Sequence, residues 1–261
     1  GTAIAAATGK TFEFSGSNWN NAGTLRAAGG IVSLTSSSGT TWASSGTLDL
    51  DSGSLNLGGT FNTASFNSLD RDGVAAGALS ITGALNNTNA TLLLDDSTGA
   101  VLLSGSITGG AIRANNPAGG ALVMNGVGYL IDTTLANVDG VAGSGLYIIN
   151  NGQSMEARGT LTLDGATVRL ASTGNWTYLR GNTSAGLTTL NIAGNGTIDF
   201  AGSAIYNSFT AWHGNSTLNI GTGINLTGTQ SADIFMGTGG TFSGTAIAAA
   251  TGKTFEFSGS N

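Results

Sequence analysis

Short segments of the chain alternate apolar and polar residues, which is the pattern of a β-strand with one buried face. Clear examples are TFEF at 11–14, TLDL at 47–50, TLTL at 160–163, TIDF at 197–200 and TLNI at 217–220. Gly, Asn and Asp residues, which favour turns, separate such segments. The pattern predicts an all-β chain built from many short strands.

An apolar anchor position recurs through these segments at intervals of 22 to 31 residues. Nine intervals fill 243 residues, and units of this length are typical of a solenoid in which each coil stacks on the last. We therefore expect a parallel β-solenoid of about nine coils per 243 residues. The irregular intervals leave an antiparallel sandwich as the alternative. The anchors expected inside the coils are Leu25, Leu48, Leu79, Ile107, Leu135, Leu161, Leu190 and Leu218, with Ala246 as the ninth.

The segment GTAIAAATGKTFEFSGSN occurs at 1–18 and again, unchanged, at 244–261. The copies lie 243 residues apart, so the chain is expected to be one period of a tandem array plus the start of the next. A single Pro rules out a Pro-rich linker, and residues 1–261 are expected to form one continuous solenoid segment. Further copies joined end to end are the expected partners, because each copy would cover an unpaired strand edge.

Two other residue types keep a fixed distance from the anchors. Glycine stands two residues before six of them, which predicts a turn that needs a permissive backbone. Those glycines are Gly23, Gly46, Gly77, Gly105, Gly159 and Gly244. Trp19, Trp42, Tyr129 and Trp212 stand six residues before four anchors, which predicts a stacking ladder. Trp176 and Tyr178 lie outside this phase and are the candidate pair for stacking on a sugar ring.

Composition supports a folded chain and removes some function classes. Hydrophobic residues make up 40% of the chain and charged residues 8%, so there is enough apolar material for a core, while 44 Gly argue against helices. The net charge of −6 excludes a nucleic-acid or anionic-membrane binder. There is no Cys and no apolar run long enough to span a membrane, so neither disulfides nor membrane insertion is expected.

Candidate chemistry is sparse. Asp70 and Asp72, in the acidic turn DRDG, are weak calcium candidates, because calcium takes six to eight oxygen ligands and the repeated motif of calcium-binding β-rolls is absent. Asp95, Asp96 and His213 faintly resemble elements of polygalacturonases, but they lie several coils apart. ATGKT resembles part of a phosphate loop, yet it lacks the first glycine and precedes a strand. We expect no catalytic activity and no cofactor.

Units such as GTLTLDGATVRLAS and STLNIGTGINLTG resemble the repeats of giant bacterial surface proteins. They also resemble the β-helical stalks of filamentous-haemagglutinin-type and autotransporter adhesins. The resemblance implies a secreted, right-handed β-helix that extends, adheres or assembles. The expected function is a structural unit of a long extracellular filament or cell-surface fibre, with lateral bundling favoured by low charge. The alternative is an adhesin stalk or glycan-binding module that uses loops such as 61–77.

Overall fold

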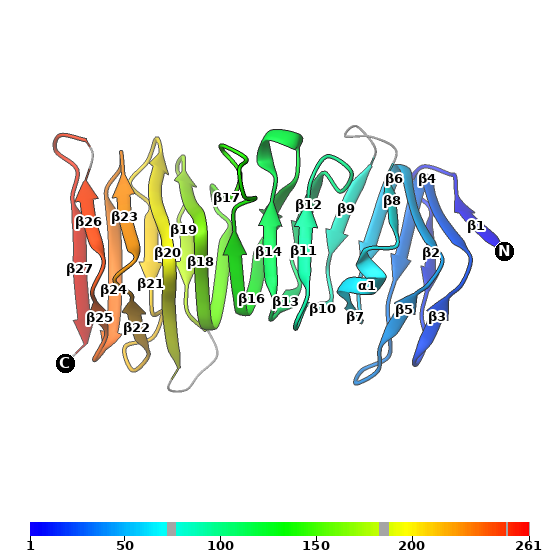
Figure 1. Cartoon of the computed structure of the whole chain (residues 1–261), viewed down its shortest axis with the longest axis horizontal. Coiled ribbons are helices and arrows are strands. Elements are labelled where there is room, and N and C mark those ends of the chain that lie inside the picture. The colour runs from blue at the N-terminus through cyan, green and yellow to red at the C-terminus, as the bar shows by residue number, and fades with distance from the viewer. Residues whose placement is uncertain (72–76, 183–187, 249, 261) are drawn as a thin grey trace.

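A computed structural model describes residues 1–71, 77–182, 188–248 and 250–260 of the chain. Strands account for 61% of the residues and helices for 2%, as the alternating pattern predicts. The strands lie side by side along the long axis of the molecule, from the N-terminal end to the C-terminal end (Figure 1). The chain winds through about eleven coils, which confirms the predicted β-solenoid and removes the sandwich alternative.

Each coil contributes strands to three stacks, which we call the first, second and third faces. The first face contains β1 (Thr2–Ala5), the first half of β4 (Thr24–Leu34), the first half of β6 (Thr47–Leu57), β8 (Leu69–Arg71), β11 (Thr91–Leu94), β14 (Ala111–Ala114), the second half of β16 (Val127–Ala136), the middle of β18 (Ser154–Ser172), the first half of β20 (Thr189–Gly202), β22 (Thr217–Ile220) and β25 (Thr241–Phe242).

The second face contains β2 (Thr11–Phe14), the second halves of β4 and β6, β9 (Ala78–Ile81), β12 (Ala100–Leu103), β15 (Ala121–Met124), β17 (Leu146–Asn150), the ends of β18 and β20, β23 (Ile224–Gly228) and β26 (Thr245–Ala248). The third face contains β3 (Trp19–Asn21), β5 (Trp42–Ser44), β7 (Thr60–Asn62), β10 (Ala84–Asn86), β13 (Ser106–Thr108), the starts of β16 and β18, β19 (Thr177–Arg180), β21 (Asn207–Thr210), β24 (Ala232–Thr238) and β27 (Phe255–Ser260).

Two short helices interrupt the coils. α1 (Thr63–Phe66) begins where the Asn62 side chain accepts a hydrogen bond from the Ser65 amide, an ordinary N-cap. η1 (Asn116–Ala118) lies between the first and second faces and contains the single Pro of the chain. The strands that flank η1 stay paired in parallel with those of the preceding coil.

Side chains alternate along each strand, and the inward set forms ladders of like residues through the molecule. In-register parallel pairing places equivalent residues of successive coils against each other, about 4.8 Å apart. Eight of the nine anchors predicted from the sequence are buried, with at most 5% exposure, whereas the ninth, Ala246, is exposed on the last coil. Burying each such side chain contributes about 1.5–3 kcal/mol. One ladder on the second face runs through Val32, Leu55, Leu79, Val101, Leu122, Tyr147, Val168, Ile198 and Leu226.

The prediction of nine coils per 243 residues is wrong, because the anchors do not all lie on one face. Leu48 is on the first face, but Leu79 pairs with Leu55 on the second and Ile107 pairs with Leu85 on the third. Each of these intervals therefore spans one coil and one additional face. The three faces carry the same alternation of apolar and polar residues, so the pattern identifies inward positions without identifying the face.

The predicted reason for the recurrent glycines is also wrong for most of them. Of the six, Gly159 has a positive φ of 72°, whereas Gly46 and Gly105 do not lie in the left-handed region. They lie where successive coils bring their backbones into close contact. A Cβ on Gly46 would overlap the carbonyl oxygen of Gly23, and one on Gly105 would overlap that of Gly83. Coil stacking, not turn conformation, requires glycine at these positions.

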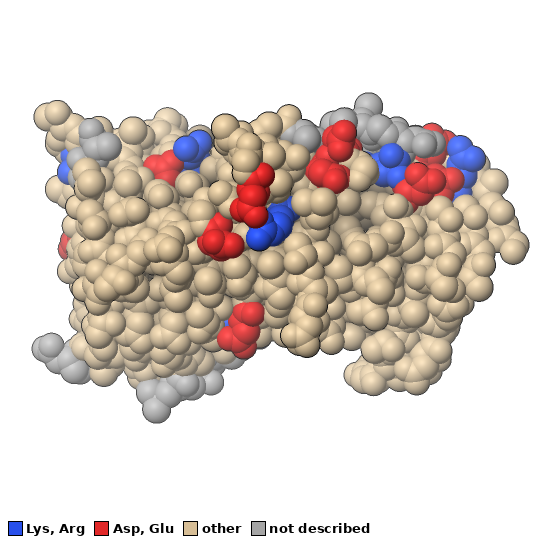
Figure 2. All heavy atoms as spheres, viewed as in Figure 1, with Lys and Arg blue, Asp and Glu red and all other residues tan. Residues whose placement is uncertain are grey.

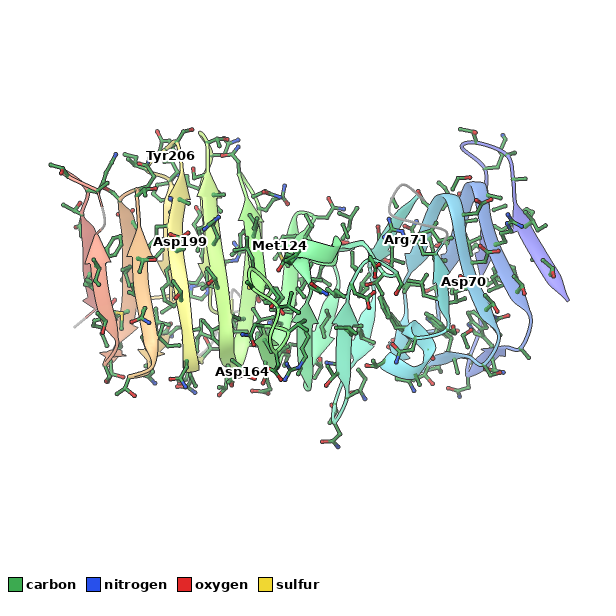
Figure 3. The ribbon with its side chains drawn as sticks, turned by 45° about the horizontal axis from the view of Figure 1, so that its top comes forward. Asp70, Arg71, Met124, Asp164, Asp199 and Tyr206 are labelled. Atoms are coloured by element: carbon green, nitrogen blue, oxygen red, sulfur yellow. The ribbon has the colours of Figure 1, made fainter. Side chains whose placement is uncertain are left out.

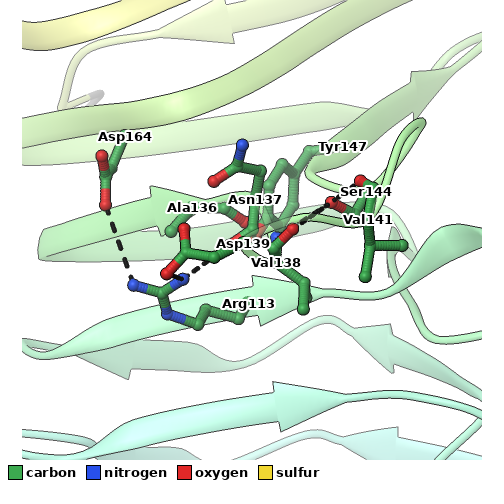
Figure 4. Close-up of polar contacts among 9 residues, drawn as sticks. All are labelled: Arg113, Ala136, Asn137, Val138, Asp139, Val141, Ser144, Tyr147 and Asp164. Atoms are coloured by element: carbon green, nitrogen blue, oxygen red, sulfur yellow. Dashed lines mark hydrogen bonds and ion pairs between the residues drawn. The ribbon is translucent and has the colours of Figure 1, made fainter.

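Tyr147 is the largest polar side chain in the core and is fully buried. Its hydroxyl lies 2.5 Å from the carbonyl oxygen of Ile112 and 2.9 Å from that of Ala136, and it donates to this pair. Figure 4 shows Tyr147 beside Ala136. Burial raises the pKa of the hydroxyl, so it stays protonated and remains a donor. Nearby, Arg113 reaches outward and donates to the Asn137 carbonyl oxygen at 2.9 Å.

Replacing Tyr147 by phenylalanine keeps the ring but removes the buried donor. We expect the free energy of unfolding to fall by about 1–2 kcal/mol, because the two carbonyls lose a partner away from water. Urea unfolding followed by circular dichroism measures this loss. Tyr129→Phe, at a half-buried position, is the control and should change stability by less than about 0.5 kcal/mol. Equal losses in the two variants would contradict the role assigned to the Tyr147 hydroxyl.

Candidate functional site

Large hydrophobic side chains that are exposed among the described residues concentrate in two places. One is the pair of outermost coils, which expose Ile4, Phe12, Phe242, Ile247 and Phe257. The other is a corner of coils eight and nine, which exposes Trp176, Ile205, Tyr206 and Trp212. Exposed apolar groups gathered in this way make these two places the candidate contact surfaces.

The second place, which we call the aromatic corner, consists of Trp176, Tyr178, Arg180, Tyr206 and Trp212. Tyr178 and Arg180 project outward from β19, and the Trp176 ring lies nearly parallel to that of Tyr178, with centroids 6.0 Å apart. Tyr206 meets Trp176 edge-on at 5.3 Å, and Trp212 meets Tyr178 edge-on at 5.4 Å. Tyr206 lies near the ends of the strands, away from Asp199 in the middle of its strand (Figure 3). Trp176 and Tyr206 immediately precede β19 and β21, and Trp212 lies two residues after β21, so the pairing of these two strands brings the rings together.

Trp212 has an unusual backbone. Its φ is +78°, in the region that favours glycine, and its amide donates to the Thr210 hydroxyl at 2.8 Å. A bulky residue in this conformation is strained, and such strain is retained where a side chain must be held in a particular place. The conformation brings the indole over Arg180, whose guanidinium carbon lies 4.5 Å from the ring centroid.

A buried carboxylate lies under this corner. Glu156, on β18, is fully buried, and its Oε1 accepts from Arg158 at 2.7 Å while Arg180 lies 3.6 Å from Oε2. Arg158 also covers the ring of Tyr129, with 4.8 Å between its guanidinium carbon and the ring centroid. A buried charge is tolerated only with such partners. Glu156 therefore fixes both arginines and links Tyr129 to the aromatic corner.

The predicted four-residue aromatic ladder is half wrong. Trp19 and Trp42 do stack, with centroids 5.6 Å apart, and Phe61 continues the stack at 4.7 Å from Trp42. Tyr129 and Trp212 instead lie on the outside, against Arg158 and Arg180. The four anchors that follow these aromatics all lie on the first face, so an equal distance from an anchor did not fix whether a side chain points inward or outward. The outward position of Trp212 left no signal in the sequence.

The candidate calcium residues do not form a site in the described part of the chain. Asp70 is exposed on β8, where it pairs in register with Asp49, and Asp72 lies outside the described residues. Arg26 neutralises this region, 3.4 Å from Asp49 and 2.8 Å from Asp51. The described residues contain no group of three or more His, Cys, Asp or Glu that could hold a metal ion.

Asp95 and His213, considered from the sequence as possible catalytic groups, lie on different coils. Asp95 is in the turn between β11 and β12, where its carboxylate accepts from the Ser97 hydroxyl at 2.6 Å and the Thr98 amide at 3.2 Å. Burial by itself would raise the pKa of Asp95, but these hydrogen bonds outweigh it and lower the pKa below its ordinary value. Asp95 organises a turn.

Because its pKa is lowered in the folded state, the Asp95 carboxylate stabilises the fold above the ordinary carboxyl pKa of about 3.9. That stabilisation is lost as the pH falls through the folded pKa. Asp95→Asn should therefore be less stable than the parent at pH 7 and equal to it in strong acid, by a small amount because the group is largely solvated. Urea unfolding at the two pH values measures the difference. Ser97→Ala should remove part of the same pH-dependent component, and an unchanged pH profile in both variants would contradict this account.

The surface is mostly uncharged. In Figure 2 most of the Asp, Glu, Lys and Arg side chains on the visible face lie in its upper and middle parts, and one further acidic group lies in its lower half. No helix among the described residues is long and apolar enough to cross a membrane. No protein-family model, curated protein or solved structure matches the chain. The class is therefore defined by the fold itself, a parallel β-solenoid of stacked three-strand coils.

Proposed function

We propose that this chain is a structural segment of an extracellular fibre, in which the β-solenoid continues from one copy of the 243-residue period into the next. One observation carries the proposal: the same sequence supplies two of the three strands at each outermost edge of the stack. β1 and β2 form the first edge, and β26 and β27, with the same sequence, form the last. Each edge has strand backbone without a covering coil, and such edges favour further pairing.

The side chains at the edges support end-to-end contact. Phe12 pairs with the fully buried Val32 and Phe257 with the fully buried Ile234, yet the two rings are 46% and 41% exposed. They are inward-facing core residues with no coil above them. Another coil would bury them, and each ring would contribute about 1.5–3 kcal/mol.

The side faces support lateral association without a charge barrier. Outward positions carry mainly Thr, Ser and Asn, and only 8% of all residues are charged. Weak repulsion between neutral faces favours bundling of fibres, in the manner that the resemblance to surface stalks implies. Bundling of this kind should respond little to salt.

End-to-end association can be tested on the 261-residue chain itself. At high concentration we expect rods that lengthen in steps of one solenoid, with a reflection near 4.8 Å along the axis. Phe12→Asp and Phe257→Asp, each at an edge, should shorten the rods at least tenfold, measured by electron microscopy. Ile205→Asp is the control because Ile205 is 58% exposed but lies away from the edges. Monomers at all concentrations, or rods that all three variants shorten equally, would overturn the proposal.

Glycan binding is the second candidate, and the aromatic corner is the observation that favours it. Trp176 is 44% exposed and Trp212 37%, and exposed aromatic faces stack on the apolar faces of sugar rings. Trp176→Ala should abolish binding on a glycan array, whereas Phe257→Ala, at the edge, should not. An array on which the parent chain binds no glycan would remove this candidate. The other region considered from the sequence, 61–77, lies partly outside the described residues.

A further inference from the structure

The two copies of the repeated segment fold in the same way. Each has a strand, a tight turn and a second strand, and the turn is closed by equivalent hydrogen bonds: Lys10 N–H to the Ala7 carbonyl at 3.0 Å, and Lys253 N–H to the Ala250 carbonyl at 3.2 Å. The glycine of the turn has nearly the same φ in both copies, 71° at Gly9 and 75° at Gly252. The segment therefore carries its own local structure wherever it is placed.

The copies nevertheless lie on different faces. β1 is on the first face, where Ala3 is opposite Leu25, but β26 is on the second face, where Ala246 is opposite Leu226. The inward positions are preserved, since both alanines face a core leucine. Only the face has changed.

The second strand of the segment moves by the same amount. β2 is on the second face, with Phe12 opposite Val32, and β27 is on the third face, with Phe255 opposite Ala232. The whole segment has thus advanced by one face. Between β1 and β26 the chain completes ten turns of the roughly eleven-coil stack and then one additional face.

We infer that one 243-residue period advances the solenoid by ten turns and one face, so that each copy in an array is rotated by one face relative to the copy before it. The inference rests on the proposed function, since it describes how consecutive copies join. It also explains why the sequence predicted nine coils per 243 residues, because intervals such as that between Leu48 and Leu79 span one coil and one additional face. A rotated copy meets no conflict, since all three faces accept the same inward alternation.

The rotation sets how surface features recur along a fibre. With coils about 4.8 Å apart, one period rises about 50 Å. The aromatic corner would recur at that spacing on successive faces, in addition to any gradual twist of the coils. It would return to the same face only after three periods, about 150 Å. A fibre built in this way presents Trp176 and its neighbours in all three lateral directions, which allows several contacts with a glycan-bearing surface at once.

Disulfide trapping in the 261-residue chain tests the face assignment, because the chain has no Cys of its own. If the segment is rotated by one face, Glu256 lies opposite Asp233; without the rotation it would lie opposite Thr227. Neighbouring parallel strands place Cα atoms within the range that a disulfide spans. We expect Asp233→Cys with Glu256→Cys to form at least ten times more intramolecular disulfide than Thr227→Cys with Glu256→Cys, measured by mass spectrometry of the oxidised monomer.

The control uses the first copy of the segment. Glu13, which is equivalent to Glu256, pairs with Ser33, so Glu13→Cys with Ser33→Cys should cross-link readily. If this control forms and the Asp233 pair does not exceed the Thr227 pair, the rotation is overturned. This outcome does not depend on fibre formation. A chain that stays monomeric refutes the proposed function, and the cross-links then still decide whether the repeated segment is rotated. Fibres in which identical faces recur every 50 Å would overturn the rotation alone.

Discussion

Replacing Gly83 by alanine is expected to destabilise the solenoid strongly. Gly83 belongs to a stack of glycines at the corner between the second and third faces, with Gly59 in the coil before and Gly105 in the coil after. A Cβ on Gly83 would overlap the carbonyl oxygen and amide nitrogen of Gly59. The corner cannot move to make room, because Ala84 donates to the Gly59 carbonyl at 2.7 Å and Ser106 donates to the Gly83 carbonyl at 2.8 Å.

The cost is expected to exceed about 3 kcal/mol, since the overlap is with backbone rather than with a flexible side chain. That is a large part of the 5–15 kcal/mol that typically separates folded from unfolded chains. Urea unfolding followed by far-ultraviolet circular dichroism measures the loss. Gly221→Ala is the matched control, because its Cβ would lie 3.1 Å from the nearest atom and its φ is not positive. We expect that variant to remain within about 1 kcal/mol of the parent; equal losses in the two variants would show that backbone overlap is not the cause.

Phe200→Ala is expected to have the second largest effect. Phe200 is fully buried on the second face, opposite Leu170 in the preceding coil and Gly228 in the following one. Because Gly228 has no side chain, the phenyl ring fills its space as well, and it meets the Phe255 ring edge-on at 5.2 Å. Removing the ring leaves a cavity that spans two coils.

The expected loss is about 3–5 kcal/mol, the usual cost of truncating a buried phenylalanine. Phe257→Ala is the control, because that ring also faces inward but is 41% exposed. It should lose much less than Phe200→Ala in the same urea titration. A smaller urea dependence of the unfolding free energy in Phe200→Ala would indicate that the last coils have separated from the rest. A loss below about 1 kcal/mol would mean that Phe255 moves in to fill the space.

The inward positions could be predicted from the sequence because alternation has a physical cause that acts within one strand. Leu48, Leu161 and Leu218 are buried as predicted, since every second side chain of a strand points to the same side. The repeated segment likewise kept its strand, turn and strand in both places. These features depend on residues that are neighbours in the chain, and such information is present in the sequence.

Which residues meet across coils was decided by the tertiary structure. A turn was predicted at the recurrent glycines, but Gly46 is required because a Cβ there would overlap the carbonyl oxygen of Gly23, which lies in the coil below and 23 positions earlier in the chain. Trp42 and Trp212 precede their anchors by the same number of residues, yet one stacks inside on Phe61 and the other packs outside on Arg180. Their distance from the anchor is the same, but Trp42 begins β5, whereas Trp212 lies after the end of β21 with a left-handed backbone conformation.

The sequence by itself determined that the chain is a β-solenoid, which side chains fill its core and that its first segment returns at its end. The tertiary structure decided the number of coils, the face on which each strand lies, the assembly of the aromatic corner over Glu156, and the shift of the repeated segment from the first face to the second. The physical reason is that alternation with a period of two residues records inside and outside but is identical on all three faces. The face is set by the length and path of each corner, where backbone contacts between coils decide.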